Sequence, residues 1–331
     1  MDALAELLRV VKLDSAIYFN AEMSEPWCLV SPESKKLAPW LAQEDRHVII
    51  FHLLWDGSAL VKLSDQDPVQ LRPGDVVCFP HGREHLLGSG LRAPRVDADV
   101  AVPDMLARGL EVLRLGGGGA RACFICGFLA CDRELSQSFL QGLPDLVKVS
   151  IHGDETGVWL ENSLKFAVGQ ATSKETGTMA MLAKLSEVLF AETLRRFARD
   201  LPIGEKGWFA SLRDPCVGKA LALILKDPAR AWTLSDLARE SAVSRTILAE
   251  RFRHFLGESP MAYLTAWRLR LGARALTSTN RSVAEIALGV GYESESAFNR
   301  AFKRMYSLPP ARYRRERGRS DPTELARNTA E

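Results

Sequence analysis

The sequence predicts a multidomain α and β protein: an N-terminal β-barrel, a helical segment, and a C-terminal all-α domain with two helix-turn-helix units. Three observations support this prediction. Short apolar runs separated by Gly, Pro and Asp turns fill residues 27–130, which is typical of an all-β sandwich or barrel. Apolar residues recur every three or four positions in residues 155–199, which is typical of helices. One helical pattern then occurs twice within residues 233–314.

In the N-terminal part, residues 48–51 and 123–126 are short, β-branched or aromatic, and are predicted to be buried strands. Pro73, Gly74 and Asp75 predict a turn. Residues 92–122 form a loop rich in Pro and Asp that ends in four glycines, 116–119. No Lys-Ser or Lys-Thr follows these glycines, so they are not a phosphate-binding loop, and a flexible hairpin connection is expected there.

The helical segment is predicted to hold two helices within residues 155–199. Five apolar residues mark the first helix: Val158, Leu160, Leu164, Phe166 and Val168. The second follows a longer apolar stripe from Met179 to Leu194. This stripe has two interpretations, a homodimer contact or packing against the barrel. The predicted domains are 1–144, 145–205 and 212–317, with a linker at 201–207, helix-turn-helix units at about 233–255 and 282–306, and a disordered tail at 318–331.

The two copies of the helical pattern lie about 50 residues apart. Ala238 and Ala287 differ by 49 positions and Phe252 and Phe302 by 50, so the second turn holds one extra residue. A small residue stands at each turn, and Gly291 in the second copy can take a positive φ without steric cost. An apolar pair four residues apart then forms the inward stripe of the next helix. These pairs are Leu248 with Phe252, and Phe298 with Phe302.

A short polar face remains on each of the second helices, 244–255 and 294–306, and such a face fits a DNA major groove. Arg pairs with guanine, Asn pairs with adenine, and Thr or Ala methyl groups suit a thymine methyl. The predicted DNA-binding residues are Arg245, Thr246, Ala249, Glu250 and Arg253 in the first copy, and Glu295, Ser296, Asn299, Arg300 and Lys303 in the second. A helix over 259–277 would hold the two units at a fixed spacing. Four further arginines are candidates for contacts to phosphates or between the units: Arg268, Arg270, Arg274 and Arg281.

The net charge of +2 is distributed unevenly along the chain. From Leu212 onward there are 21 Lys and Arg against 13 Asp and Glu, and before it 22 against 28. A basic C-terminal part and an acidic N-terminal part suit a nucleic-acid reader joined to a domain that does not bind DNA.

The N-terminus carries acidic residues where a signal peptide needs a basic start, and no apolar run approaches the roughly 20 residues of a membrane span. A cytoplasmic protein without membrane contact is therefore expected. Its six cysteines are then interpreted as thiols rather than structural disulfides.

The repeat resembles the AraC/XylS family of bacterial transcription regulators. Gly257, Pro260 and Tyr263 in the first copy, and Pro310 and Tyr313 in the second, match the family signature over about residues 212–316. Ser307 departs from the pattern, since the family usually has Gly after the last helix, and a looser helix end is expected there. The resemblance implies double-stranded promoter DNA and RNA polymerase as partners.

A stretch of the barrel resembles the second conserved motif of the cupin family. It runs from Gly74 through Pro80 and Gly82 to His85. The first cupin motif is eroded to a lone His52, with Gln70 near the place of a carboxylate. Because a metal needs three or four convergent ligands, the predictions are no metal, no cofactor and no catalytic residue. His52 and His85 are expected to line a ligand pocket.

Cysteines cluster on a second barrel stretch, at positions 123, 126 and 131. This stretch resembles the sensor half of AraC-like regulators, including a subgroup that responds to reactive chlorine or other electrophiles through cysteine. On a strand, Cys123 and Cys131 share one face and Cys126 the other, so the three cannot bind one metal. Buried core thiols are one interpretation and a redox site the other, with candidates Cys126, Cys123, Cys28 and Cys78. A sensing thiol should be partly exposed with a lowered pKa. Cys126 comes first because it precedes Gly127, where the strand can bend, and lies close to Arg121 in sequence.

Two functions are therefore open. The first is a sequence-specific transcription regulator, an activator by resemblance, whose barrel senses a small molecule or oxidant. The second is a cupin metalloenzyme fused to a DNA-binding module, which the missing first-motif ligands disfavour. A purely architectural DNA protein would leave the N-terminal two-thirds without a role.

Overall fold

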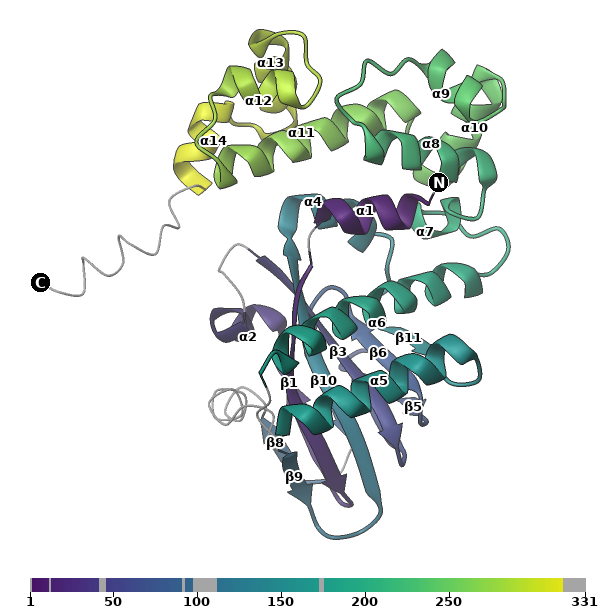
Figure 1. Cartoon of the computed structure of the whole chain (residues 1–331), viewed down its shortest axis with the longest axis vertical. Coiled ribbons are helices and arrows are strands. Elements are labelled where there is room, and N and C mark those ends of the chain that lie inside the picture. The colour runs from purple at the N-terminus through teal and green to yellow at the C-terminus, as the bar shows by residue number, and fades with distance from the viewer. Residues whose placement is uncertain are drawn as a thin grey trace, which may run out of the picture. The chain divides into compact units, whose positions relative to one another are not determined.

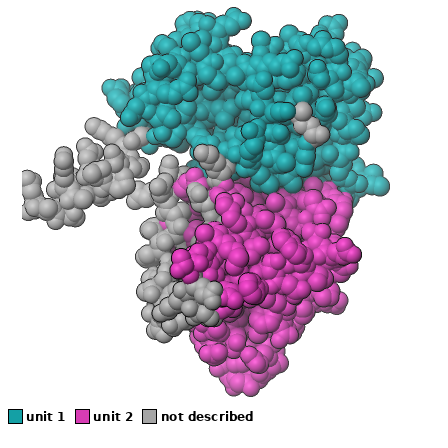
Figure 2. Space-filling model, in the orientation of Figure 1, with its two compact units in different colours: residues 1–11, 132–138, 201–331 teal, residues 12–131, 139–200 magenta. Residues whose placement is uncertain are grey.

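The computed structural model describes residues 2–11, 13–41, 46–90, 93–97, 112–172 and 176–317. The chain divides into two compact units, shown in different colours in Figure 2. The helical unit comprises Met1–Val11, Asp132–Ser138 and Leu201–Glu331, and the β unit comprises Lys12–Cys131 and Phe139–Asp200. Two short segments that were predicted as part of the barrel domain thus belong to the helical unit. The predicted tail at 318–331 lies outside the described residues.

Two sheets form the β unit. The six-stranded sheet has the order β11-β6-β3-β10-β1-β9, and the five-stranded sheet has the order β5-β4-β7-β2-β8. The first contains β1 (Asp14–Ser24), β3 (Arg46–Asp56), β6 (Asp75–Phe79), β9 (Val112–Gly116), β10 (Arg121–Asp132) and β11 (Val147–Ser150). The second contains β2 (Cys28–Ser31), β4 (Ala59–Leu63), β5 (Val69–Leu71), β7 (His85–Gly88) and β8 (Arg95–Asp97). Helix α2 (Ser34–Leu41) lies between β2 and β3 in the chain.

The two sheets enclose one apolar core. Alternate residues of β3, β6 and β10 contribute to it, among them Ile50, Phe79 and Phe124, which are fully buried. The prediction of buried strands at 48–51 and 123–126 is confirmed. The alternation puts Cys126 in this core, and Cys123 and Cys131 on the other face of β10.

The four glycines do not form a hairpin, and that prediction is wrong. Strand β1 lies between β9 and β10, parallel to the first and antiparallel to the second, so residues 116–119 cross over the end of β1. A Cβ atom on Gly116 would lie 1.7 Å from the carbonyl oxygen of Ser24. Glycine is therefore required by close backbone approach as well as by the φ of +124° at Gly116.

Helices α5 (Glu155–Thr172) and α6 (Thr178–Asp200) lie across one face of the six-stranded sheet (Figure 1). The prediction of two helices in this segment is confirmed. Two of the residues that were expected on the inward stripe of α5 are instead exposed, Val158 by 47% and Phe166 by 62%. Leu160 and Leu164 make the buried stripe because they are four residues apart and share one face of the helix.

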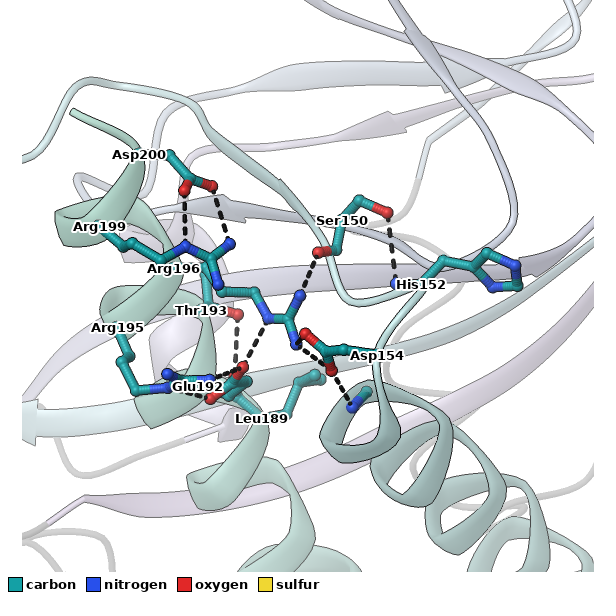
Figure 3. Close-up of polar contacts among 11 residues, drawn as sticks. Ser150, His152, Asp154, Leu189, Glu192, Thr193, Arg195, Arg196, Arg199 and Asp200 are labelled. Atoms are coloured by element: carbon teal, nitrogen blue, oxygen red, sulfur yellow. Dashed lines mark hydrogen bonds and ion pairs between the residues drawn. The ribbon is translucent and has the colours of Figure 1, made fainter. Parts of the chain in front are cut away.

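A buried arginine joins α6 to the chain just before α5 (Figure 3). The side chain of Arg196 is 3% exposed and donates to Glu192 Oε1 at 2.5 Å, to both carboxylate oxygens of Asp154, and to the Ser150 carbonyl. Asp154 also accepts from the Gly157 N–H at the start of α5. One guanidinium therefore ties together the end of β11, the start of α5 and the C-terminal third of α6.

The helical unit contains α1 (Ala3–Val11), α4 (Arg133–Leu140, whose first six residues belong to this unit), and a C-terminal array. The array comprises α7 (Trp208–Ser211), α8 (Pro215–Lys226), α9 (Leu234–Glu240), α10 (Arg245–Leu256), α11 (Pro260–Ser278), α12 (Val283–Gly289), α13 (Glu295–Tyr306) and α14 (Pro310–Arg317). Figure 1 shows α11 as the long helix that connects the α8–α10 group with the α12–α14 group. The spacer helix predicted over 259–277 is thereby confirmed.

The two helix-turn-helix units share their local chemistry. Reciprocal capping boxes, Thr233 with Asp236 and Ser282 with Glu285, begin α9 and α12. The turns pass through positive φ, +57° at Ala242 and +92° at Gly291. The reading helices both end in the left-handed conformation, at Gly257 and at Ser307 with φ of +60°. Ser307 therefore adopts the left-handed conformation that favours glycine, the residue found at the equivalent position 257.

Candidate DNA-binding surface and sensor site

Helices α10 and α13 present the two candidate reading surfaces. Ser244 and Ser294 cap them, accepting hydrogen bonds from the backbone N–H groups of Ile247 and Ala297. Leu248 and Phe252 in α10, like Phe298 and Phe302 in α13, are completely buried. These pairs fix the rotation of each helix, so that its polar face is turned away from the core.

Eight of the ten predicted DNA-binding residues are exposed and two are half-buried. The half-buried residues are Ala249 and Asn299. In the second unit, Glu295, Asn299, Arg300 and Lys303 line a hollow of about 280 Å³ together with the start of α14. Their donors and acceptors thus lie around one concave surface, as the reading of base edges requires.

Three of the four arginines that were candidates for contacts to phosphates or between the units, Arg268, Arg274 and Arg281, donate hydrogen bonds within the protein. The Nε of the fourth, Arg270, is buried without a hydrogen-bond partner among the described residues. Arg268 donates to the carbonyls of Pro228 and Arg230 at 2.7 Å and so ties α11 to the chain ahead of α9. Arg281 donates to the carbonyl of Glu285. Arg251, which was not among the predicted residues, is exposed on α10 and pairs with the α8 cap Asp214 at 3.0 Å. Arg251 lies four residues after the exposed Ile247, so the two side chains share one face of α10, and this spacing can be recognised in the sequence.

A hydrogen-bonded chain of three side chains lies buried in the β unit. His52 on β3 contacts Cys126 Sγ on β10 through Nδ1 at 2.8 Å. The same ring contacts His85 Nε2 through Nε2 at 2.9 Å. His85 begins β7, in the other sheet, and its Nδ1 lies 3.0 Å from the carbonyl oxygen of Arg83. The ring of His85 also stacks on Phe79 with centroids 3.5 Å apart.

The carbonyl of Arg83 sets the direction of every hydrogen bond in this chain when both rings are neutral. A carbonyl only accepts, so His85 Nδ1 donates and His85 Nε2 accepts. His52 Nε2 is then the donor to His85, and His52 Nδ1 accepts from the Cys126 thiol. This assignment makes the three residues a continuous path for a proton from Cys126 to His85.

Burial controls the ionisation of all three groups. It lowers the pKa of His52 well below the ordinary value, with the neighbouring His85 as a second cause. Burial also lowers the pKa of His85 to about 4, although its hydrogen bond to Arg83 opposes the shift. It raises the pKa of the Cys126 thiol well above the ordinary value. At neutral pH the chain is therefore uncharged, with the proton on sulfur.

The expectation of a partly exposed Cys126 with a lowered pKa is wrong. The three other barrel candidates, Cys28, Cys78 and Cys123, are buried as well, and burial raises the pKa of each thiol, that of Cys78 to about 12. Arg121 pairs with Glu22 rather than with Cys126. The irregularity anticipated at Gly127 lies in β1, between Ile17 and Phe19, opposite Cys126 and Gly127. Of the six cysteines, all within the described residues, Cys216 is the one with partial exposure.

The described part of the β unit has hollows on its surface. His85 lines a polar one of about 290 Å³, with Lys62, Ser64, Glu84, Arg95, Val30 and Leu86. His52 is not among these residues, so the predicted pair is divided between the hollow and the buried chain. A more apolar hollow of about 320 Å³ is lined by Trp27, Cys28, Val96 and Leu115, with Pro26, Leu29, Pro94, Gly116 and Gly117.

The geometry around His52 is that of a relay rather than of a chelate. His52 uses one ring nitrogen toward Cys126 and the other toward His85, so its two neighbours lie on opposite sides of the ring. Gln70 is hydrogen-bonded to the carbonyls of Ala59 and Leu71 and does not join them. Across the described residues, no three His, Cys, Asp or Glu side chains are placed to hold a metal ion.

Among the described helices, none has both the length and the apolar character that a bilayer span requires.

Both parts of the chain match known protein families. Residues 2–199 match a cupin family model, and residues 237–316 match a helix-turn-helix domain model. An AraC-like transcription regulator of Streptomyces lividans is 32% identical over 83% of this chain and 90% of its own. Another from Streptomyces antibioticus is 31% identical over 95% and 99%. The RCS-specific transcriptional activator RclR of Escherichia coli K12 is 28% identical over 95% and 97%.

These matches run through both the β unit and the tandem reading helices and extend over nearly the whole length of the relatives. The chain therefore belongs to the AraC-like family of DNA-binding transcription regulators, with an N-terminal cupin domain and a C-terminal helix-turn-helix domain.

Proposed function

We propose that this regulator reads two successive major-groove segments of promoter DNA with α10 and α13, and that its cupin domain senses an oxidant or small molecule. The observation that carries the proposal is the pair of equivalent polar faces. Each is capped by a serine, rotated outward by a buried apolar pair, and rich in groups that recognise bases. We infer that the protein is not an enzyme, because its relatives are named as regulators.

Binding of the full chain to DNA upstream of its own and neighbouring genes tests the DNA-reading proposal. The affinity should fall steeply with salt, because each neutralised phosphate releases counterions. Six phosphate contacts would lower it about a thousandfold between 50 and 200 mM salt. Binding measured by fluorescence anisotropy over this range gives the slope. A folded protein whose binding to every such fragment is independent of salt would contradict the proposal.

Replacing Arg300 with alanine should cost about 1–3 kcal/mol of binding free energy and relax the preference at one base pair of the site. Arg300 is exposed in α13 and lines the hollow beside α14. The measurement is affinity for a panel of sites with single base changes. Arg239→Ala is the matched control, since it removes an exposed arginine on α9 that pairs with Asp236. An equal loss of affinity on all sequences would make Arg300 a phosphate contact instead.

We propose two protein partners. Apolar side chains on α5 and α6 are exposed, including Trp159, Phe166, Met181 and Val188, and a second copy of this chain would cover them. RNA polymerase is proposed as the other partner, because a relative that matches nearly the whole chain is named as a transcriptional activator.

Oxidant sensing is proposed at Cys126, with the histidine chain as its proton path. At rest burial keeps the proton on the Cys126 sulfur. The thiolate, which is the reactive form, would arise only as His52 Nδ1 accepts this proton and His52 Nε2 gives its own proton to His85. With hypochlorous acid, the sulfur would attack chlorine and form an S–Cl bond as the Cl–O bond breaks. The departing hydroxide would take the thiol proton back from His52 Nδ1 as His85 returns a proton to His52 Nε2, so the products are a sulfenyl chloride and water.

Cys126→Ser should abolish the change in DNA affinity that hypochlorous acid produces in the wild type. Cys123→Ser is the matched control, because Cys123 is buried on the opposite face of the same strand. The measurement is affinity for promoter DNA before and after treatment. Identical responses of the wild type and Cys126→Ser would eliminate Cys126 as the sensor. No response in either would favour a small ligand in the hollow lined by His85.

A further inference from the structure

A carboxylate from the cupin segment of the chain lies against the second helix-turn-helix unit. Glu134, in the first turn of α4, accepts a hydrogen bond from the Tyr306 hydroxyl at 3.0 Å and from the Tyr313 hydroxyl at 3.1 Å. Arg317 Nη1 lies 3.3 Å from the same carboxylate. These donors come from the last residue of α13 and from α14. Burial, followed by the nearby carboxylate, raises the pKa of both tyrosines, so the hydroxyls stay protonated and can donate.

The same segment and α1 hold other parts of the helical unit. Arg274, on α11, lies 3.5 Å from the carboxylate of Asp132 and donates to the carbonyl of Val10 at 2.9 Å. Helix α1 packs against α8, with Leu7 and Val11 completely buried. We call α1 and Asp132–Ser138 together the bracket. The bracket contacts α8, which packs on the first helix-turn-helix unit, and α11, which lies between the units. It also contacts α13 and α14 in the second unit.

The bracket is covalently continuous with two paired strands. Strand β1 begins at Asp14, shortly after α1 ends at Val11, and β10 ends at Asp132. Asp14 is the partner of Ala130 in the antiparallel pair, so both bracket segments leave the sheet at the same end. Strand β10 carries Cys126, so the candidate sensor thiol and the clamp at Glu134 belong to one short stretch of chain.

The core of the second unit does not depend on Glu134. Ile286, Phe298, Phe302 and Tyr313 pack with one another and with α11, whereas the polar contacts of Glu134 within the described residues are with the two tyrosine hydroxyls and one arginine. The contacts of Glu134 therefore add to those of α11 in holding the second unit in place. Placement matters because two reading helices on one DNA face must be about 34 Å apart. An acidic group on the basic helix α14 also lowers the positive potential that attracts phosphates.

We propose that Glu134 is an autoinhibitory clamp that restrains the second helix-turn-helix unit, and that opening it raises affinity for DNA sites that both units read. Strand β10 continues directly into the bracket, so a signal that shifts this strand would change the balance between the closed and the open clamp. It would do so because it affects the two states differently. The proposal rests on DNA reading by both units, and the experiment distinguishes its failure from failure of that reading.

The test measures the affinity of the full chain for a mapped site and for the same site with the half read by α13 scrambled. Glu134→Gln and Tyr306→Phe weaken the clamp from its two sides while keeping the size of each side chain. Both variants should bind the intact site about fivefold or more tightly than the wild type, in the range of ordinary allosteric couplings. On the scrambled site the same variants should equal the wild type.

Glu316→Gln is the matched control, because it removes an equal charge from α14, where Glu316 pairs with Arg312 and not with the bracket. A smaller gain for Glu316→Gln than for Glu134→Gln supports the clamp. Equal gains would assign the effect to charge alone and overturn the proposal. Unchanged or weaker binding by both clamp variants would overturn it as well. Equal wild-type affinity for intact and scrambled sites would instead refute reading by the second unit.

Discussion

Phe302→Ala should lower the free energy of unfolding of the helical unit by about 3–5 kcal/mol, the cost of emptying the space of a buried aromatic ring. Phe302 has no exposed surface, and its ring lies 5.3 Å from that of Phe298 and 5.2 Å from that of Tyr313. A domain has only about 5–15 kcal/mol of stability, so a large part of it would be lost. DNA binding should fall with it, because Phe302 sets the rotation of the reading helix.

The measurement is denaturant unfolding followed by helical circular dichroism. Met305→Ala is the control, since Met305 lies on the same helix and is 38% exposed. A surface substitution of this kind should change stability by no more than about 0.5 kcal/mol. Equal effects of the two substitutions would show that Phe302 is not a core residue.

Arg196→Met should destabilise the β unit by about 3 kcal/mol, the lower end of the range for breaking a buried ion pair. The change keeps much of the side-chain volume but removes the group that joins Glu192, Asp154 and the Ser150 carbonyl. The lower end applies because Glu192 keeps its pair with Arg195. Arg199→Met is the matched control on the same helix. It breaks only an exposed pair with Asp200 and should leave the unfolding curve unchanged.

The difference between the wild type and Arg196→Met should depend on pH. Burial of Glu192 opposes its ionisation, but the hydrogen bonds from Arg195 and Arg196 outweigh burial and hold its pKa below 4.5. A lowered carboxylate pKa contributes stability that is present above the unfolded value and is lost as the pH falls through the folded one. The two proteins should therefore differ most near neutral pH and converge below pH 4.5. A difference that grows toward acid would contradict this account of Glu192.

The helix-turn-helix repeat was predictable from sequence because its signals are local. The serine caps at 244 and 294, the turn residues Ala242 and Gly291, and the apolar pairs all act within a few residues. The reading helices were predicted at 244–255 and 294–306 and are found at Arg245–Leu256 and Glu295–Tyr306. The outward faces followed from the same periodicity.

The sensor site depends on contacts between residues that are distant in the chain. His52 and Cys126 are 74 positions apart and meet only because β3 and β10 are neighbours in the sheet. The alternation of β10 correctly put Cys126 on a different face from Cys123, but it could not reveal that the Cys126 face packs against the five-stranded sheet. Without that knowledge, Cys126 was expected to be exposed and acidic, whereas burial raises its pKa.

The sequence by itself determined the division into cupin and helix-turn-helix domains, the two reading helices and the residues on their polar faces. Spacing and capping carry this information because helical and strand periodicity is set by backbone geometry. Only the tertiary structure decided the Cys126–His52–His85 chain, the Arg196 cluster and the contact of Glu134 with Tyr313, 179 positions away. Long-range partners are selected by packing and by the burial of polar groups, which leave no periodic trace in the sequence.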